Sequence, residues 1–369
     1  MDNVETSVKV IVIGVGGAGS NAVNRMIDDE MTSVDFFVMN TDLQSLQSSK
    51  VPSANRVLLG GKTTGGLGSG GDPTIGKQAA EKSVDEIRKA VKGANMVFIA
   101  AGMGGGTGTG AAPIIANICR EEGALTVAIV TRPFGFEGKK RMATSVAGMR
   151  DLKESVDAVI IVSNDKLLMS NGGDSIINAF QESDRVLSQS VKTVTDLIYM
   201  PGIINLDFAD VRNVLQNSGT ALIGYGIGEG ASKALDAANS AISSPLLEAS
   251  ISGARRAICA VTCGPTVSLY ETQECINHIV EVAGNALDVK LGVSINEQLG
   301  DQILVSVIAS DFIGDNDFNN TILDEISKPI LSIKNEQEVK PAPKKIEKKP
   351  EKKEDDDILP SFLKNINAD

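Results

Sequence analysis

The chain has 369 residues, 42% of them hydrophobic, which is enough for two domains with cores of their own. Its formal net charge of −12 argues against nucleic acid as the main partner, and no long apolar run or N-terminal leader indicates a transmembrane helix or secretion. With a single histidine, His278, and four cysteines that form no CxxC pair, the composition offers almost nothing for a zinc site or a Ser-His-Asp triad, and we expect the cysteines to be reduced and buried.

Residues 8 to about 170 alternate short apolar runs with helical patterns. The runs are rich in valine and isoleucine and do not alternate cleanly between apolar and polar residues, which is typical of strands covered on both faces. Five such runs are Val8–Ile13, Val34–Met39, Met96–Ala101, Leu125–Val130 and Ala158–Val162. This order predicts a domain of class α/β over residues 8–172, with a parallel, doubly wound, Rossmann-like sheet.

Two glycine-rich stretches, Gly14–Asn21 and Gly104–Gly110, each follow one of these runs and precede a helical pattern. A glycine-rich turn between strand and helix exposes backbone N–H groups at the positive end of the helix, where a phosphate chain binds well. The second helix is expected to begin near Ala111, with Pro113 in its first turn. Two such turns on one sheet predict a nucleotide held from two sides, although glycines that only allow tight turns would give the same pattern.

The first glycine stretch also fits a different class of protein. Gly14, Gly16 and Gly19 match the dinucleotide-binding pattern G-x-G-x-x-G, and Asp42, about twenty residues further on, would be the acid that binds a ribose. A nicotinamide-dependent oxidoreductase is therefore one alternative. It leaves the second glycine stretch unexplained, and nothing nearby offers a histidine or an acid–base pair for hydride chemistry. Neither stretch ends in Gly-Lys-Ser/Thr, which excludes a Walker loop.

A helical pattern from about Asp174 to Tyr199 predicts a long central helix over residues 173–200. The pattern ends before Pro201, which is followed by glycine and is a strong stop signal. Residues 201–316 then mix helical stretches with strand-like runs, and we expect them to form a smaller α/β domain.

The last part of the chain has a different composition. Lysine, glutamate, aspartate and proline dominate after about Lys334, and we expect residues 317–357 to be a disordered linker because they cannot build a core. An apolar island, Ile358–Lys364, opens the final segment, residues 358–369. An apolar island beyond a disordered tether predicts a docking peptide for a partner, with an accidental apolar stretch as the alternative.

The stretch Gly104–Gly110, which reads GGGTGTG, resembles the signature loop of the tubulin superfamily in its bacterial cell-division branch, the FtsZ family. The resemblance extends over essentially the whole folded region, through segments that include Gly14–Asn21, Asn40–Asp42, Gly65–Gly70, Thr131–Met142, Ser163–Leu167, Asn178–Phe180, Pro201–Val211 and Ala241–Glu248. It implies a GTPase of cell division that polymerises head to tail into filaments, with GTP hydrolysed at the contact between two subunits.

By this resemblance the two glycine stretches hold the phosphates of GTP through backbone N–H groups and the hydroxyls of Thr107 and Thr109. Phe180 would stack on the guanine, and Asp184, one helical turn later, would accept from its N1–H and 2-amino group. Adenine has no hydrogen at N1 and a carboxylate offers only acceptors, so this position would select guanine. The implied GTP-binding residues are Gly17, Ala18, Gly19, Ser20, Asn21, Gly104, Gly105, Gly106, Thr107, Gly108, Thr109, Thr131, Glu137, Arg141, Asn164, Phe180 and Asp184.

Four residues of this set also have ordinary structural explanations. Without the resemblance, Phe180 would be assigned to the core and Asp184 to the solvated surface. Glu137 and Arg141, four residues apart, would form a surface ion pair that contributes little stability; the resemblance implies that they contact the ribose and phosphates instead.

Asp207 and Asp210 have a structural and a catalytic interpretation. Asp207 precedes the helical run Phe208–Leu215 and Asp210 lies in its first turn, and both positions are typical of helix capping. The resemblance implies instead that Asn205, Asp207 and Asp210 enter the nucleotide site of the next subunit, where the carboxylates orient the attacking water. Both roles are compatible, because a capped helix end holds its acids rigidly. Mg²⁺ is expected between the phosphates, bound mostly by water, and no protein residue is assigned as its ligand.

The resemblance also covers the terminal island. Pro360, Phe362 and Leu363 match the family's short peptide that docks onto membrane-tethering and regulatory division proteins, although Ile358-Leu359 stands where the family has Asp-Ile before the proline. This implies a cytoplasmic protein at the division ring, on the inner face of the membrane, which reaches the membrane only indirectly and binds no nucleic acid. A non-catalytic filament or adaptor protein is the remaining alternative.

Overall fold

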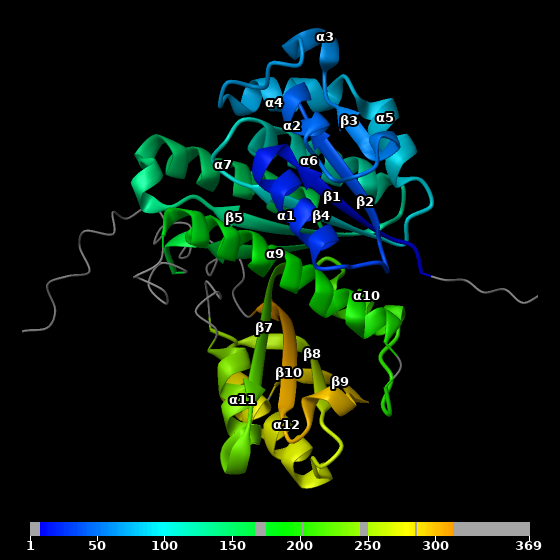
Figure 1. Cartoon of the computed structure of the whole chain (residues 1–369), viewed down its shortest axis with the longest axis vertical. Coiled ribbons are helices and arrows are strands. Elements are labelled where there is room, and N and C mark those ends of the chain that lie inside the picture. Colours follow the sequence, from blue (N-terminus) through cyan, green and yellow to red (C-terminus); the bar gives the residue numbers. More distant parts are fainter. Residues whose placement is uncertain (1–7, 167–174, 201, 244–249, 285, 313–369) are drawn as a thin grey trace, which may run out of the picture. The chain divides into compact units, whose positions relative to one another are not determined.

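The computed structural model describes residues 8–166, 175–200, 202–243, 250–284 and 286–312, with the side chain of Ile176 excepted (Figure 1). All of these residues belong to one compact unit of the chain. The predicted linker and docking peptide, residues 317–357 and 358–369, lie outside the described residues.

Five parallel strands, one for each of the predicted apolar runs, form the centre of the sheet. They are β1 (Val10–Val15), β2 (Asp35–Asn40), β4 (Met96–Gly102), β5 (Leu125–Arg132) and β6 (Ala158–Ser163). With the short strand β3 (Arg56–Leu58) they lie in the order β3-β2-β1-β4-β5-β6, so the winding reverses between β1 and β4. Ligands bind beyond the carboxyl ends of the strands at such a switch point, and the two glycine stretches follow these two strands.

Helices cover both faces of this sheet, as the unbroken apolar runs predict. On β1, Ile11 and Ile13 pack in one core with residues of α5 and α6, while Val10 and Val12 pack in a second core with residues of α1 and α9. The elements up to residue 155 are α1 (Gly16–Asp28), α2 (Leu43–Gln47), α3 (Gly61–Thr64), α4 (Pro73–Glu81), α5 (Val84–Val91), α6 (Thr107–Glu121) and α7 (Lys139–Ser155), with short 3₁₀ turns at η1 (Ser53–Asn55) and η2 (Gly135–Glu137).

The expected start of α6 near Ala111 is wrong. The helix begins at Thr107, and Pro113 is its seventh residue, where its missing N–H leaves the helical hydrogen-bond ladder incomplete. Two glycines in the first turn are poor helix formers, but tight packing requires both. A Cβ on Gly110 would lie 2.0 Å from the carbonyl oxygen of Pro73 in α4, and a Cβ on Gly108 would lie 2.6 Å from the carbonyl oxygen of Gly102. The positive end of α6 therefore lies within the second glycine stretch itself.

The long central helix is α9 (Ile176–Tyr199), 24 residues that begin after Ser175, whose hydroxyl accepts from the backbone N–H of Asn178. At about 1.5 Å per residue it is about 36 Å long. Near its start, Ser183 donates to Asn164, just beyond the carboxyl end of β6, whereas near its end the hydroxyl of Tyr199 donates to the carbonyl of Val8, just before β1. The helix thus runs from the carboxyl edge of the parallel strands to their amino edge (Figure 1).

The remaining described residues continue the same sheet. Strand β7 pairs with the start of β6 in parallel, and β10, β8 and β9 follow in that order, with α11 and α12 packed against them around a third core. The four cysteines are free and buried, as expected. The elements are α10 (Phe208–Leu215), β7 (Gly219–Gly228), η3 (Gly230–Ser232), α11 (Lys233–Ile242), β8 (Ala254–Cys263), α12 (Leu269–Ala283), β9 (Asp288–Ile295), η4 (Glu297–Leu299) and β10 (Ile303–Phe312).

Candidate functional site

The two glycine stretches touch each other at the switch point between β1 and β4. Gly16 has a left-handed backbone with φ of 72°, and a Cβ at this position would lie 3.0 Å from the backbone nitrogen of Gly108. A Cβ on Gly108 would in turn lie 2.6 Å from the carbonyl oxygen of Gly102. Side chains at these positions would push the two stretches apart, so the glycines allow the first turns of α1 and α6 to lie side by side.

Two other predicted site residues, Thr131 and Arg141, lie against this pair of turns. A Cβ on Gly102 would lie 2.6 Å from the Cβ of Ala18 and 3.5 Å from Oγ1 of Thr131. Gly104 has φ of 94°, and a Cβ there would lie 2.7 Å from the carbonyl oxygen of Arg141. Residues from four separate segments are therefore brought to the same end of the sheet.

The first turn of α1 is the open side of this region. Gly17, Ala18 and Asn21 are exposed, and a Cβ on Gly17 would meet nothing within 4 Å. Neither α1 nor α6 carries an acidic residue in its own first turn, where such a residue would repel an anion at the positive helix end. The arrangement is suited to a phosphate chain.

The hydroxyls of three predicted nucleotide-binding residues, Ser20, Thr107 and Thr109, all take part in bonds within the protein. Ser20 donates to the carbonyl of Gly16 at 2.7 Å, and Oγ1 of Thr109 accepts from the backbone N–H of Gly104 at 2.9 Å. Oγ1 of Thr107 lies 2.7 Å from the hydroxyl of Thr41 and 3.1 Å from that of Ser69. These bonds hold the glycine stretches in shape, and Thr109 keeps a proton to donate.

Glu137 and Arg141 form the ion pair that their spacing predicts, with 3.0 Å between Oε2 and Nη1. The other carboxylate oxygen of Glu137 accepts from the backbone N–H of Phe134 at 2.8 Å. The Glu137 side chain is only 11% exposed and that of Arg141 53%. The acid therefore fixes the turn after β5, and the exposed side chain of Arg141 starts beside Gly104 and pairs with Glu137.

Phe180 lies at the start of α9 and is 43% exposed, so it does not belong to the core. Its ring meets the buried ring of Phe134 edge to face, with 5.0 Å between centroids, and Phe134 stacks on the exposed ring of Phe136 at the same separation. Sequence patterns did not single out Phe134, because its contact with Phe180 on α9 joins segments more than forty residues apart. The exposed face of Phe180 is free to stack on a planar base.

Asp184 lies one turn after Phe180 and is half-buried. Burial raises the pKa of its carboxyl to about 6, and the positive charge of Arg25 acts in the opposite direction. The neighbouring Ser183 donates to the buried Asn164 at 2.8 Å. Asn164, Phe180 and Asp184 thus form one end of the site, beyond the carboxyl ends of β5 and β6.

Three acids that the sequence analysis singled out, Asp42, Asp207 and Asp210, cap helices in the structure. Asp42, the acid of the dinucleotide pattern, caps α2 by accepting from the backbone N–H groups of Gln44 and Ser45. Asp207 and Asp210 form a reciprocal capping box on α10: Oδ1 of Asp207 accepts from the N–H of Asp210 at 2.9 Å, and Oδ2 of Asp210 accepts from the N–H of Asp207 at 3.3 Å. The capping interpretation of Asp207 and Asp210 is confirmed.

Asn205, Asp207 and Asp210 lie at the opposite edge of the sheet from the other predicted site residues. They fall between Tyr199, which bonds to Val8 before β1, and Asn217, whose N–H donates to Oδ1 of Asp157 directly before β6. The 15 residues from Asp184 to Tyr199 alone span about 22 Å of helix. One subunit therefore keeps these acids away from its own glycine stretches.

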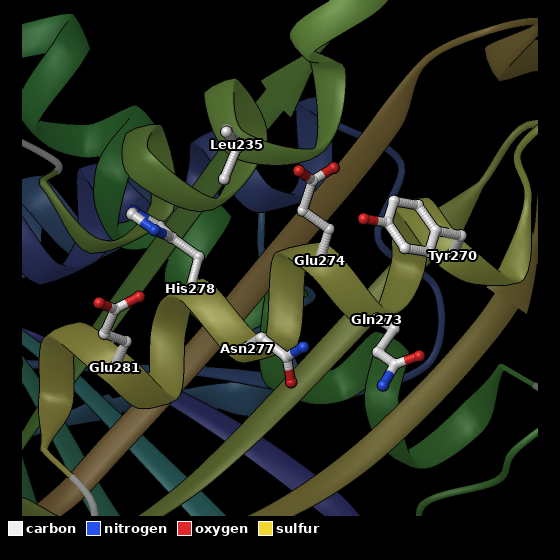
Figure 2. Close-up of a pocket in the computed structure, with 7 residues that line it drawn as sticks. All are labelled: Leu235, Tyr270, Gln273, Glu274, Asn277, His278 and Glu281. Atoms are coloured by element: carbon white, nitrogen blue, oxygen red, sulfur yellow. The ribbon is translucent and has the colours of Figure 1, made fainter.

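A separate hollow of about 260 Å³ lies between α11 and α12 (Figure 2). Leu235 on α11 lies opposite Glu274 and His278 on α12, and His278 is held by a 2.6 Å hydrogen bond between Nε2 and Oδ1 of Asn239. None of the predicted nucleotide-binding residues lines this hollow. It is a distinct surface feature of the described chain.

Comparison with known proteins gives two matching family models. The GTPase domain of the Tubulin/FtsZ family matches residues 9–172, and the C-terminal domain of the FtsZ family matches residues 219–313. The described part of the chain has no helix that is long and apolar enough to cross a membrane.

Solved structures with the same fold include an empty FtsZ dimer of M. jannaschii, with 38% identity and a TM-score of 0.77, covering 83% of this chain and 89% of that one. CetZ1 of Haloferax volcanii, a GDP-bound monomer, has 20% identity and a TM-score of 0.72, covering 87% of this chain and 100% of that one. CetZ2 of the same organism, a GTPgS-bound protofilament, has 22% identity and a TM-score of 0.71 with the same coverage.

Proposed function

The chain belongs to the tubulin/FtsZ family and is a tubulin-like polymerising GTPase; from this premise we propose that its subunits join head to tail and complete one another's catalytic site. The GTPase assignment replaces both alternatives left by the sequence, a nicotinamide-dependent oxidoreductase and a non-catalytic filament or adaptor protein. In the proposed assembly, each contact joins the nucleotide end of one subunit to the acidic end of the next.

One observation carries this proposal: the glycine turns lie beyond the carboxyl ends of β1 and β4, whereas Asp207 and Asp210 lie at the amino edge of the same sheet. A carboxylate that orients water for attack on a phosphate must lie within hydrogen-bond reach of that water. The two groups cannot meet in one molecule, but a repeated head-to-tail contact brings them together at every interface. Such a heterologous contact continues into a filament when its rotation does not close. CetZ2 of Haloferax volcanii, which shares the fold, is a protofilament with GTPgS bound.

The described residues also support the proposed binding of GTP. The first turns of α1 and α6 would hold the phosphates, and Thr131, Glu137 and Arg141 would hold the sugar and phosphates from the β5 side. Asn164, Phe180 and Asp184 would bind the base. An ionised Asp184 accepts two hydrogen bonds from guanine but finds no N1–H on adenine, so it would distinguish GTP from ATP.

Hydrolysis would depend on the acidic end of the neighbouring subunit. The capping box holds the carboxylates of Asp207 and Asp210 in fixed positions at the start of α10, where they would orient and polarise the attacking water, with Asn205 beside them. The described residues contain no group of three or more histidines, cysteines, aspartates or glutamates that could hold a metal ion. As expected from the sequence, we propose that Mg²⁺ binds between the phosphates, mostly through water, where it would neutralise phosphate charge.

The experiment that tests the shared site mixes two inactive variants. Asp210→Ala keeps the nucleotide site and loses the acid, whereas Phe180→Ala combined with Asp184→Ala loses base binding and keeps the acid. Each should be inactive alone. In an equal mixture about a quarter of random head-to-tail contacts join an intact site to an intact acid, so GTPase activity should return to a similar fraction of the wild-type value. If the mixture stays inactive while both variants enter filaments, the shared site is wrong.

For the remaining parts of the chain we propose the organisation expected from the sequence: a GTP-binding domain over residues 8–172, a central helix over 173–200, a C-terminal domain over 201–316, a linker over 317–357 and a docking peptide over 358–369. We also propose a role in the cytoplasmic ring of a dividing cell, tethered through Pro360, Phe362 and Leu363. Removing residues 358–369 should leave GTPase activity unchanged and abolish binding to tether-coated membranes. Unchanged membrane binding would show that another segment docks.

A further inference from the structure

A hydrogen-bonded network joins α1 to α9 next to Asp184. The buried hydroxyl of Ser188 donates to Oδ2 of Asp29 at 2.9 Å, and Nε of Arg25 donates to Oδ1 of the same carboxylate at 3.2 Å. Asp29 is thus shared between the two helices. The side chains of Arg25 and Asp29 are 38% and 37% exposed, so the network lies at the border between core and solvent.

The spacing of these residues places Arg25 opposite Asp184. Arg25 lies one turn before Asp29 on α1, and Asp184 lies one turn before Ser188 on α9. Because Asp29 meets Ser188 and the two helices pack against each other in one core, the preceding turns of both helices are also neighbours. The charge of Arg25 accordingly acts on the Asp184 carboxyl, against the effect of burial.

Other charged groups on these two helices have partners elsewhere. Glu182 and Arg185, the neighbours of Asp184 on α9, pair with each other at 3.6 Å. On α1, Asp28 pairs with Lys50 at 2.6 Å. Among the described residues, Arg25 is the cation whose field reaches Asp184, and Asp29, the acid beside Arg25, is itself engaged by Arg25 and Ser188.

We propose that Arg25, fixed by Asp29 and Ser188, is a positioning residue for guanine recognition, which keeps Asp184 ionised so that it can accept hydrogen bonds from the N1–H and 2-amino group of the base. This inference rests on the proposed role of Asp184 and adds a determinant from another helix. Arg25 does not touch the base. It extends the pH range over which the site prefers guanine, because a protonated carboxyl loses half of its acceptor capacity.

The test is the pH dependence of nucleotide affinity, measured on the full chain with a non-hydrolysable GTP analogue and its ATP counterpart from about pH 5.5 to about pH 8. Removing a nearby opposite charge raises a carboxyl pKa by about one unit or more. In Arg25→Gln the affinity for the GTP analogue at about pH 6 should therefore be about tenfold below its value at pH 8, against about twofold in the wild type. Arg25→Lys keeps the charge and should restore most of the wild-type profile.

Two controls separate the possible failures. Arg185→Gln removes a cation beside Asp184 in sequence whose partner is Glu182, and it should leave the profile unchanged. Asp184→Asn should abolish both the pH dependence and the preference for the GTP analogue. If Asp184→Asn leaves the preference intact, the proposed base recognition is wrong. If Asp184→Asn abolishes it and Arg25→Gln keeps the wild-type profile, only the role of Arg25 is wrong.

A purely structural tie between α1 and α9 would behave differently. Loss of such a tie would lower the free energy of unfolding and the affinity at every pH, without moving the midpoint of the profile. Ser188→Ala, which removes the anchor of Asp29 but no charge, gives a second measurement should Arg25→Gln fold poorly. It should move the midpoint upward by less than Arg25→Gln does. A midpoint that stays fixed in both Ser188→Ala and Arg25→Gln, with reduced stability, would overturn the proposal in favour of the structural tie.

Discussion

The two edges of the parallel sheet hold their carboxylates in opposite ways. At the carboxyl edge, Asp184 is half-buried, and burial raises its pKa to about 6. At the amino edge, Asp207 is exposed and Asp210 partly so, and each accepts from a backbone N–H of the same turn. A half-buried carboxylate is suited to binding a ligand at a site within its own subunit. The arrangement at the amino edge holds charge at the surface, as an acid that acts on another molecule requires.

The central helix connects these two edges. Phe180 and Asp184 lie in its first turns, and Tyr199 closes it beside the start of β1. The helix is therefore one continuous element between the proposed nucleotide site and the acids at the amino edge. The comparison predicts that variants at the amino edge affect hydrolysis and those at the carboxyl edge affect binding.

The largest effect is expected for Asp210→Asn. The amide oxygen can still accept from the N–H of Asp207, so the cap is kept while the negative charge is lost. Because a carboxylate that activates water contributes about a hundredfold or more, GTP turnover in assembled protein should fall by about that factor. Affinity for GTP should be unchanged, and filaments should persist longer. Phosphate release and pelleting measure the two effects. Normal turnover in assembled Asp210→Asn would leave Asp210 with a capping role alone.

The next largest effect is expected for Asp184→Asn, which replaces one acceptor by a donor. The preference for GTP over ATP should fall by about 1–3 kcal/mol, or roughly tenfold to a hundredfold. Equal binding of GTP and ATP by the wild type would show that Asp184 does not recognise the base.

The same variant should alter stability with a defined pH dependence. The folded-state pKa of Asp184, about 6, lies above the value of an ordinary carboxyl. The folded chain therefore binds more protons than the unfolded chain between these values, and stability falls as the pH rises through this window. Asp184→Asn should raise the free energy of unfolding in urea above about pH 6, and the gain should vanish near about pH 4. Asp196→Asn, which removes a partly exposed acid of the same helix that pairs with Lys192, is the control.

Local patterns were sufficient to predict much of this fold. The five apolar runs, the long helix and the cap at Asp207 each depend on residues within one segment, where side-chain periodicity and capping chemistry act. The tight turns at the glycine stretches were also predicted from local pattern. Their backbone conformations agree, because φ values of 72° at Gly16 and 94° at Gly104 favour glycine. The roles assigned to individual nucleotide-binding residues stay predictions.

What local patterns missed depends on contacts between distant segments. The start of α6 at Thr107 follows from packing against α4, and the aromatic group around Phe134 forms only when α9 meets the turn after β5. The hydroxyl of Thr107 meets Thr41 and Ser69, which lie 66 and 38 residues away along the chain. No spacing rule in the sequence connects such pairs.

A smaller effect on binding is expected for Phe180→Ala. The exposed ring would lose its stacking on the base, which contributes on the order of 1 kcal/mol beyond burial, so affinity for GTP and ATP should fall by a similar, roughly fivefold factor. Tyr270→Ala removes an exposed aromatic ring from α12, next to the hollow in Figure 2, and should leave affinity unchanged. A loss confined to GTP would indicate that Phe180 helps to orient Asp184 rather than to stack on the base.

The smallest effect is expected for the cap itself. Asp207→Ala removes the acceptor for the N–H of Asp210 and should lower the free energy of unfolding by about 1 kcal/mol, whereas Asp207→Asn keeps that acceptor and should be nearly neutral. Ser268→Ala removes the matching cap of α12, where Ser268 and Glu271 form the same reciprocal bonds, and should cost a similar amount of stability with no loss of GTPase activity. If Asp207 acts only through the cap, turnover should follow stability, and Asp207→Asn should be fully active. If its charge acts on the neighbouring subunit, Asp207→Asn should keep the wild-type free energy of unfolding but turn over GTP more slowly. We expect this second combination.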